Sequence, residues 1–186
     1  FNDLETIIHW ISEHSEFKTN ADRNKLHLIG HSRAGGIVTI KAEENNRITK
    51  VVSLAGVCDF GKRTATIGDL NEWKREGVKY ILNGRTKQQM PHFYQFYKDF
   101  INNEERLTIK RAVSNLKTPY LIIHGNADTS VLIDEAKSLH LWSPNSELVV
   151  IEGANHVFGA SHPWTQTTLS LHLEKTIQAM ILFLKK

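Results

Sequence analysis

The sequence predicts an α/β protein with a mostly parallel sheet and helices on both faces of that sheet. Short apolar segments alternate with amphipathic segments along most of the chain, as in strands joined by right-handed helical crossovers. Segments 49–55 and 120–124 are apolar almost throughout, which is typical of parallel strands buried on both faces. The 186-residue chain is 40% hydrophobic and 23% charged, so it can bury a core of this kind. Its apolar runs fall far short of the roughly 20 residues that cross a bilayer, so no membrane partner is expected.

The predicted elements follow one another in chain order. Ile7, Ile8 and Ile11 recur at helical spacing and predict a first helix over residues 2–17. The elements expected after it are strands at 25–30, 49–55, 120–124 and 146–151, and helices at 33–46, 133–142 and 165–184. Together they predict one domain over residues 1–186.

Residues 57–117 interrupt this alternation of strands and helices. Four aromatic residues in this segment share the spacing of one helix face: Phe93, Phe96, Tyr97 and Phe100. Pro91 suits an early position of the same helix, since the first turn needs no proline N–H. A helix inserted after a central strand typically packs over the carboxyl edge of the sheet, where α/β proteins bind ligands. We therefore expect residues 57–117 to form a helical cap insertion.

Charge and cysteine content exclude several classes of partner. The net charge is +3, and segment 57–117 alone holds 12 basic and 7 acidic residues. These charges are interleaved and form no dense basic run, which argues against a nucleic-acid partner. Cys58 is the only cysteine, so neither an internal disulfide nor a cysteine-based zinc site is expected, and a cytoplasmic location is predicted. The histidines form no HExxH arrangement, so no metal and no other cofactor is expected.

Ser32 is the candidate nucleophile. It lies in Gly30-His31-Ser32-Arg33-Ala34, where a predicted strand turns into a helix. A serine at such a turn must adopt a strained backbone conformation so that its hydroxyl clears the sheet, and bulky flanking residues would collide there. Small residues stand two positions before and after Ser32, as this nucleophile elbow requires. The backbone amide of Arg33, directly after the nucleophile, is then expected to donate to the oxyanion.

Asp128 and His156 are the candidate partners of Ser32. Asp128 follows the predicted strand 120–124, and His156 follows the predicted strand 146–151. Loops at the carboxyl ends of parallel strands meet at one edge of the sheet, so the three side chains should converge. An imidazole can take the serine proton near neutral pH, and a carboxylate can fix its tautomer. The order Ser, Asp, His matches a catalytic triad of this fold class.

Asp59 is the rival for the acidic position, because it lies four residues beyond the second predicted strand. The context of Asp128 matches more residues, and we favour it. Three other histidines lie near the predicted site. His31 is expected to point away from any triad role, His124 to brace the acid loop, and His162 to line the site.

These motifs resemble the α/β-hydrolase superfamily, in particular its dienelactone-hydrolase-like and prolyl-oligopeptidase-like serine esterases. The resemblance rests on the elbow 30–36, the acid loop 124–128 and the histidine loop 153–158, and it is vaguest over 61–116. It implies a metal-independent acyl transfer in two steps through an acyl-serine. We therefore expect a serine hydrolase of small or medium carboxylic esters, with Ser32, His156 and Asp128 as its triad. A serine peptidase, or an inactive binding protein on the same scaffold, is the alternative.

The sequence departs from this superfamily before the elbow. Only one helix precedes the strand 25–30, so the earlier loop that normally supplies the second oxyanion donor is missing. The strand 25–30 would also form a bare edge of a parallel sheet. We expect this edge to be paired by upstream residues of a longer polypeptide, by another chain or by a second copy. The second oxyanion donor is expected to come from outside the 186 residues.

Overall fold

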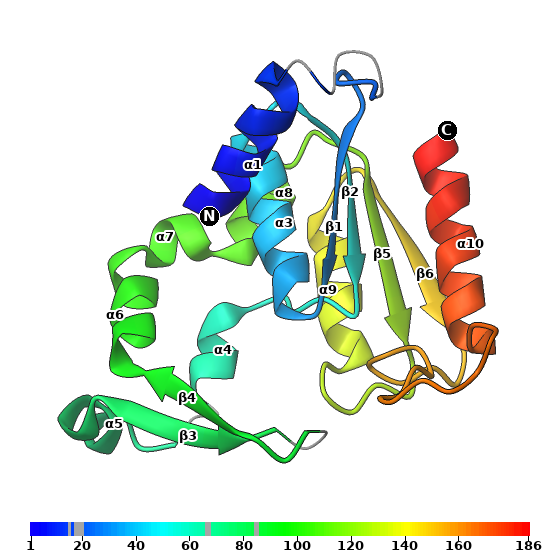
Figure 1. The fold of residues 1–186 in the computed structure, drawn as a ribbon. Coiled ribbons are helices and arrows are strands. Elements are labelled where there is room, and N and C mark those ends of the chain that lie inside the picture. Colours follow the sequence, from blue (N-terminus) through cyan, green and yellow to red (C-terminus); the bar gives the residue numbers. More distant parts are fainter. Residues whose placement is uncertain (15, 17–20, 66–67, 84–85) are drawn as a thin grey trace.

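The central sheet confirms the predicted α/β class. The structure, a computed structural model, describes residues 1–14, 16, 21–65, 68–83 and 86–186. Four parallel strands form the sheet in the order β1-β2-β5-β6 (Figure 1): β1 (Leu26–His31), β2 (Ile48–Leu54), β5 (Tyr120–Gly125) and β6 (Ser146–Ile151). Their carboxyl ends point to the same edge, so the loops that follow β1, β5 and β6 meet there.

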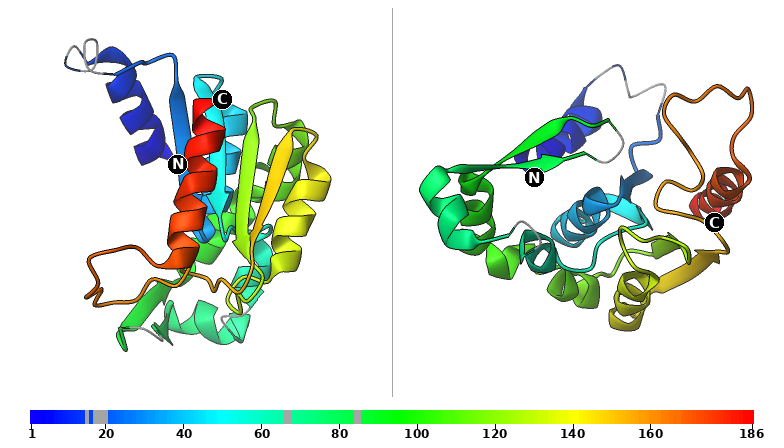
Figure 2. Two further views of the ribbon diagram at one scale, coloured as in Figure 1. Left: turned by 90° about the vertical axis from the view of Figure 1, so that its right-hand side faces the viewer. Right: turned by 90° about the horizontal axis from the view of Figure 1, so that it is seen from below.

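Helices cover both faces of the sheet, as predicted. One face is covered by α3 (Arg33–Glu44), α8 (Ile109–Asn115) and α9 (Ile133–Trp142), and α10 (Leu171–Lys185) covers the other (Figures 1 and 2). Neighbouring strand residues alternate between the two cores: Val51 packs in the core of the first face and Val52 in that of the second. This alternation follows from the two-residue period of a strand. It explains why β2 and β5 are apolar on both sides.

The amino-terminal helix is shorter than expected. It forms α1 (Asn2–Glu13), whose buried Ile8 joins the same core as α3. Residues 15 and 17 of the predicted helix lie outside the described residues. The next helix, α3, ends at Glu44 rather than at residue 46.

The segment between β2 and β5 is not wholly helical. It contains α4 (Phe60–Ala65), α5 (Leu70–Glu76), β3 (Val78–Leu82), β4 (Gln89–Phe93), α6 (Tyr94–Asn102) and α7 (Glu104–Leu107) before α8. The strands β3 and β4 form an antiparallel hairpin that the sequence analysis did not predict (Figure 1). The last helix, α8, packs against α3 and belongs to the main core.

The prediction that Pro91 opens a helix was wrong. Pro91 lies within β4, opposite Tyr80 of β3, and the helix begins only at Tyr94. A proline is tolerated here because each strand of an isolated hairpin has a free edge that needs no N–H donor. The hairpin is anchored by Trp73 of α5, whose buried indole donates a 2.7 Å hydrogen bond to the His92 carbonyl.

The carboxyl-terminal helix begins later than expected. The predicted helix 165–184 forms only from Leu171, as α10, and residues 165–170 are not helical. Ser170 caps the helix by accepting a hydrogen bond of 3.2 Å from the Leu173 amide. Threonines at 165, 167 and 168 are poor helix formers, which favours a start after them.

Within the described ranges, β1 pairs only with β2, and its outer edge faces no strand. The expected pairing of this edge therefore stays a prediction. None of the described helices is long and apolar enough to cross a membrane.

Candidate active site

Ser32 occupies a sharp turn between β1 and α3. Its backbone has φ 57° and ψ −122°, a conformation that costs about 1–3 kcal/mol for a residue other than glycine. The turn is held by two hydrogen bonds: the Ser32 amide donates to the Leu54 carbonyl at 2.9 Å, and the Gly35 amide donates to the Ser32 carbonyl at 3.0 Å. The neighbouring strand and the first turn of α3 thus hold the serine in a strained conformation, as expected for a nucleophile elbow.

Gly30 leaves room for this turn. A Cβ atom added at Gly30 would lie 2.3 Å from the carbonyl oxygen of Ala34. We expect Gly30→Ala to lower the free energy of unfolding by about 1–3 kcal/mol, because two backbone segments would have to separate. Chemical denaturation of the two proteins measures the difference. An unchanged midpoint would contradict the requirement for a small residue at this position.

The structure brings Ser32, His156 and Asp128 together. His156 Nε2 lies 3.0 Å from Ser32 Oγ, and His156 Nδ1 lies 2.7 Å from Asp128 Oδ2. The three residues come from the loops after β1, β6 and β5, at the carboxyl edge of the sheet. With the Nδ1 proton donated to Asp128, Nε2 is left as an acceptor for the serine hydroxyl.

The second oxygen of Asp128 fixes the carboxylate in place. Asp128 is buried, with 4% of its surface exposed, and Oδ1 accepts hydrogen bonds from the amides of Ser130 at 2.8 Å and Val131 at 2.9 Å. Burial by itself raises the pKa of Asp128, but the Val131 amide, His156 and the Ser130 amide together lower that pKa below its ordinary value. Asp128 therefore remains an anion at neutral pH despite its burial.

The rival acid, Asp59, is engaged elsewhere. Its Oδ1 accepts hydrogen bonds from the amides of Gly61 at 2.7 Å and Lys62 at 3.2 Å, in the first turn of α4. This is the role of a residue that caps a helix start. In the described part of the chain, Asp59 makes no hydrogen bond or ion pair with His156, whose carboxylate partner is Asp128.

Two further histidines support the site. His124 is fully buried, and its Nε2 bonds the Val131 carbonyl at 2.8 Å, so it braces the acid loop as expected. His31 differs from expectation: its Nε2 lies 2.8 Å from the His156 carbonyl, and the two rings are 4.8 Å apart. Burial lowers the pKa of His31, which favours its neutral form. His31 therefore contacts the histidine loop, 125 positions away in the chain, and no local sequence pattern indicates this contact.

Arg33 begins α3. The amide of the first helical residue has no partner within its own helix, so it is available to a ligand at Ser32. The Arg33 side chain extends to the insertion, where its guanidinium lies 5.0 Å from the centre of the Phe96 ring. Sequence reasoning assigned Arg33 only a backbone role and missed this position of its side chain.

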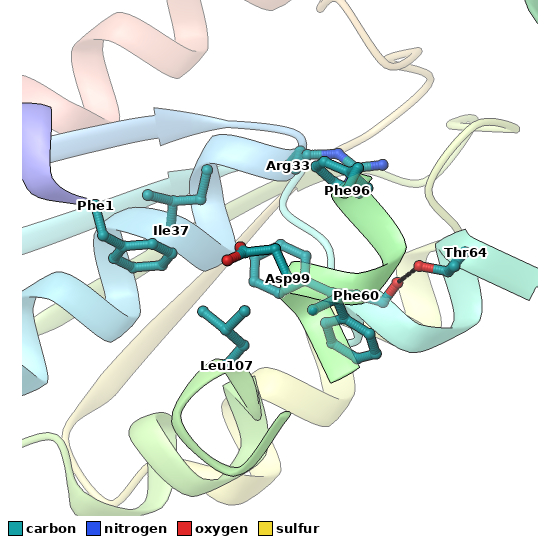
Figure 3. A pocket seen from close by; sticks show the side chains of 9 residues that line it. Phe1, Arg33, Ile37, Phe60, Thr64, Phe96, Asp99 and Leu107 are labelled. Carbon is teal, nitrogen blue, oxygen red and sulfur yellow. Dashed lines mark hydrogen bonds between the residues drawn. The ribbon is translucent and has the colours of Figure 1, made fainter. Parts of the chain in front are cut away.

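A cavity of about 200 Å³ lies beside Arg33, between α3 and the insertion (Figure 3). Its lining is mainly apolar: Phe1, Arg33, Ile37, Phe60, Thr64, Phe96, Asp99, Phe100 and Leu107. Neither Ser32 nor His156 lines this cavity, so Arg33 is the residue that connects it with the elbow. His162 does not line it either.

Cys58 is not a competing nucleophile. The thiol is buried, and its pKa is raised to about 11 by burial and by the charge of Glu135. At pH 8 only about one thousandth of such a thiol is thiolate. We expect iodoacetamide to modify the native protein far more slowly than the protein unfolded in guanidinium, as measured by mass spectrometry. Equal rates in the two states would show that Cys58 is accessible.

The described residues contain no group of three or more histidine, cysteine, aspartate or glutamate side chains that could hold a metal ion. No family model and no curated protein sequence matches the chain. Solved structures do match, although at low sequence identity.

Three of these solved structures are an esterase domain, the protein Est1E and a monoacylglycerol lipase. The esterase domain from a Rhodothermus marinus protein is 21% identical, with a TM-score of 0.58 over 86% of this chain and 61% of that one. Est1E from Butyrivibrio proteoclasticus is 16% identical, with a TM-score of 0.69 over 97% of this chain and 66% of that one. A monoacylglycerol lipase of Paleococcus ferrophilus is 17% identical, with a TM-score of 0.67 over 98% of this chain and 72% of that one.

A further structure of Est1E contains bound ferulic acid. The chain spans roughly two thirds of the length of the esterase domain, of Est1E and of the lipase. It has the α/β-hydrolase fold, and its structural neighbours include esterases and lipases, as the resemblance predicted.

Proposed function

We propose that the protein is a serine hydrolase that cleaves carboxylic esters through an acyl-serine. The observation that carries this proposal is the chain of contacts from Ser32 Oγ through His156 to the buried Asp128, at 3.0 and 2.7 Å. At these distances an imidazole can take the proton of the serine hydroxyl, and the carboxylate can stabilise the imidazolium that forms. The strained backbone of Ser32 further supports the role of this serine as a nucleophile.

In the proposed reaction, Ser32 Oγ attacks the ester carbonyl carbon while its proton passes to His156 Nε2. His156 then gives this proton to the leaving alcohol as the bond to that oxygen breaks, and an acyl-serine remains. A water molecule next loses a proton to His156 and attacks the acyl carbon. The carboxylic acid leaves, and the proton returns to Ser32.

The developing negative charge on the carbonyl oxygen needs hydrogen-bond donors. We propose the Arg33 amide as one donor, since it follows the nucleophile at the start of α3. The insertion 57–117 is proposed as a cap over the substrate, with its aromatic residues near the cavity beside Arg33.

Labelling with a fluorophosphonate probe tests this proposal, together with hydrolysis of p-nitrophenyl esters of graded acyl length and of the matching anilides. We expect covalent labelling at a single serine and hydrolysis of the short and medium esters. Faster cleavage of the anilides would favour the peptidase alternative. A folded protein that is neither labelled nor active would support the binding-protein alternative.

A further inference from the structure

The Arg33 guanidinium has no hydrogen-bonded or ion-paired partner in the described part of the chain, although it is half-buried. Other arginines of the protein do have such partners. Arg63 pairs with Glu135, Arg106 with Glu44 and Arg111 with Glu43. Burial lowers the pKa of Arg33, and the positive charge of Arg63 lowers it further. A partly desolvated cation without a counter-ion is costly unless something else supplies the negative charge.

The nearest carboxylate on the cavity wall does not supply it. Asp99 lines the same cavity, but its Oδ1 lies 3.3 Å from the side-chain amide of Asn103 and forms no ion pair with Arg33. In Figure 3 the Asp99 carboxylate points to the side of Phe1 and Ile37, away from the guanidinium. Arg33 instead lies over the face of Phe96, which stabilises a cation but leaves its N–H groups unused.

The position of Arg33 connects this free charge with the reaction centre. Its Cα lies only about 3.8 Å from that of Ser32, because the two residues are consecutive. The Arg33 side chain therefore starts from the residue directly after the proposed nucleophile. The 200 Å³ cavity that Arg33 lines offers apolar walls to the carbon chain of a ligand, among them Ile37, Phe60 and Phe100.

We propose that Arg33, together with this cavity, binds a carboxylate that the ester substrate carries a few atoms from the scissile bond. Monoesters of short dicarboxylic acids have this chemistry. A guanidinium binds a carboxylate through two parallel hydrogen bonds. Because Asp99 lines the same cavity, one arginine suits a ligand group with a single negative charge better than a doubly charged phosphate. This inference rests on the proposed hydrolase function and names its substrate class.

The test compares kcat/KM for monoethyl glutarate with kcat/KM for ethyl pentanoate. Ethyl pentanoate has the same acyl length but carries no free carboxylate. We expect the protein to prefer the anionic ester about ten- to hundredfold, the scale of hydrogen bonds to a charged group. Arg33→Gln should bring this ratio close to one, and Arg33→Lys should give an intermediate ratio. If the substitution distorts the turn at Ser32, kcat/KM falls for both esters by the same factor, and the ratio of the two values does not change.

Lys98→Gln is the matched control, since it removes one positive charge from an exposed position of α6. It should leave the ratio unchanged. The proposal is overturned if the protein does not prefer the anionic ester or if Arg33→Gln keeps the preference. It is equally overturned if Lys98→Gln abolishes the preference, because the effect would then come from overall charge.

A separate binding measurement distinguishes failure of this inference from failure of the hydrolase function. Calorimetric titration with glutarate needs no turnover. If neither ester is cleaved and no serine is labelled, the proposed hydrolase function fails. Glutarate binding that is lost in Arg33→Gln then still supports the carboxylate site, and equal or absent binding in both proteins overturns it.

Discussion

Replacement of Ser32 by alanine is expected to abolish covalent labelling and to reduce kcat by about 10⁶-fold, as removal of a triad serine does. The hydroxyl oxygen that lies 3.0 Å from His156 Nε2 is the only non-hydrogen atom removed. The strained backbone at φ 57° is equally accessible to alanine and serine, since both carry one Cβ. The fold should therefore persist, and circular dichroism and thermal unfolding should match those of the parent.

Ser138→Ala provides the matched control for this experiment. Ser138 lies in α9 and donates to the Asp134 carbonyl, away from the three converging loops. Its loss should leave labelling and turnover at parental values. Labelling that survives in Ser32→Ala would assign the nucleophile to another residue and contradict the proposed function.

The parallel strands could be predicted because their signal is local. Segments such as 120–124 are apolar throughout, and β5 is indeed buried along its whole length. The positions of Ser32, Asp128 and His156 follow from the same information, since each stands in the segment that follows a strand. Parallel topology then brings their loops to one edge without any knowledge of side-chain contacts.

The hairpin β3–β4 could not be predicted in the same way. Its strands are short, and the helical spacing of Phe93, Phe96, Tyr97 and Phe100 extends across the boundary between β4 and α6. Its partner contact, from Trp73 to the His92 carbonyl, joins residues 19 positions apart. Strand pairing of this kind depends on packing rather than on intrinsic preference.

The start of α10 did have a sequence signal. Ser170 directly precedes the apolar residues of the helix, as helix-capping residues do. The contacts of His31 and of the Arg33 side chain had no such signal, because each depends on a segment distant in the chain. Ser32, Asp128, His156 and the bracing His124 could thus be predicted from motifs, whereas the contacts of His31 and of the Arg33 side chain could not.

Replacement of Asp128 by asparagine should lower kcat by about 10⁴-fold, as a wrongly set histidine tautomer does in triads. Asparagine keeps an oxygen that can accept from the Ser130 and Val131 amides, so the acid loop should stay folded. Its amide group, however, would donate to His156 Nδ1 where the carboxylate now accepts. The imidazole proton then moves to Nε2, and the ring can no longer take the proton of Ser32.

Asp59→Asn makes the same chemical change at the rival position. The asparagine oxygen can still accept from the amides of Gly61 and Lys62, so kcat should remain within a few-fold of the parent. Steady-state kinetics on one ester compare the two variants. Because both substitutions remove one negative charge, their difference reports the position of the carboxylate rather than the overall charge. A large loss in Asp59→Asn with a small one in Asp128→Asn would move the acid to the loop after β2.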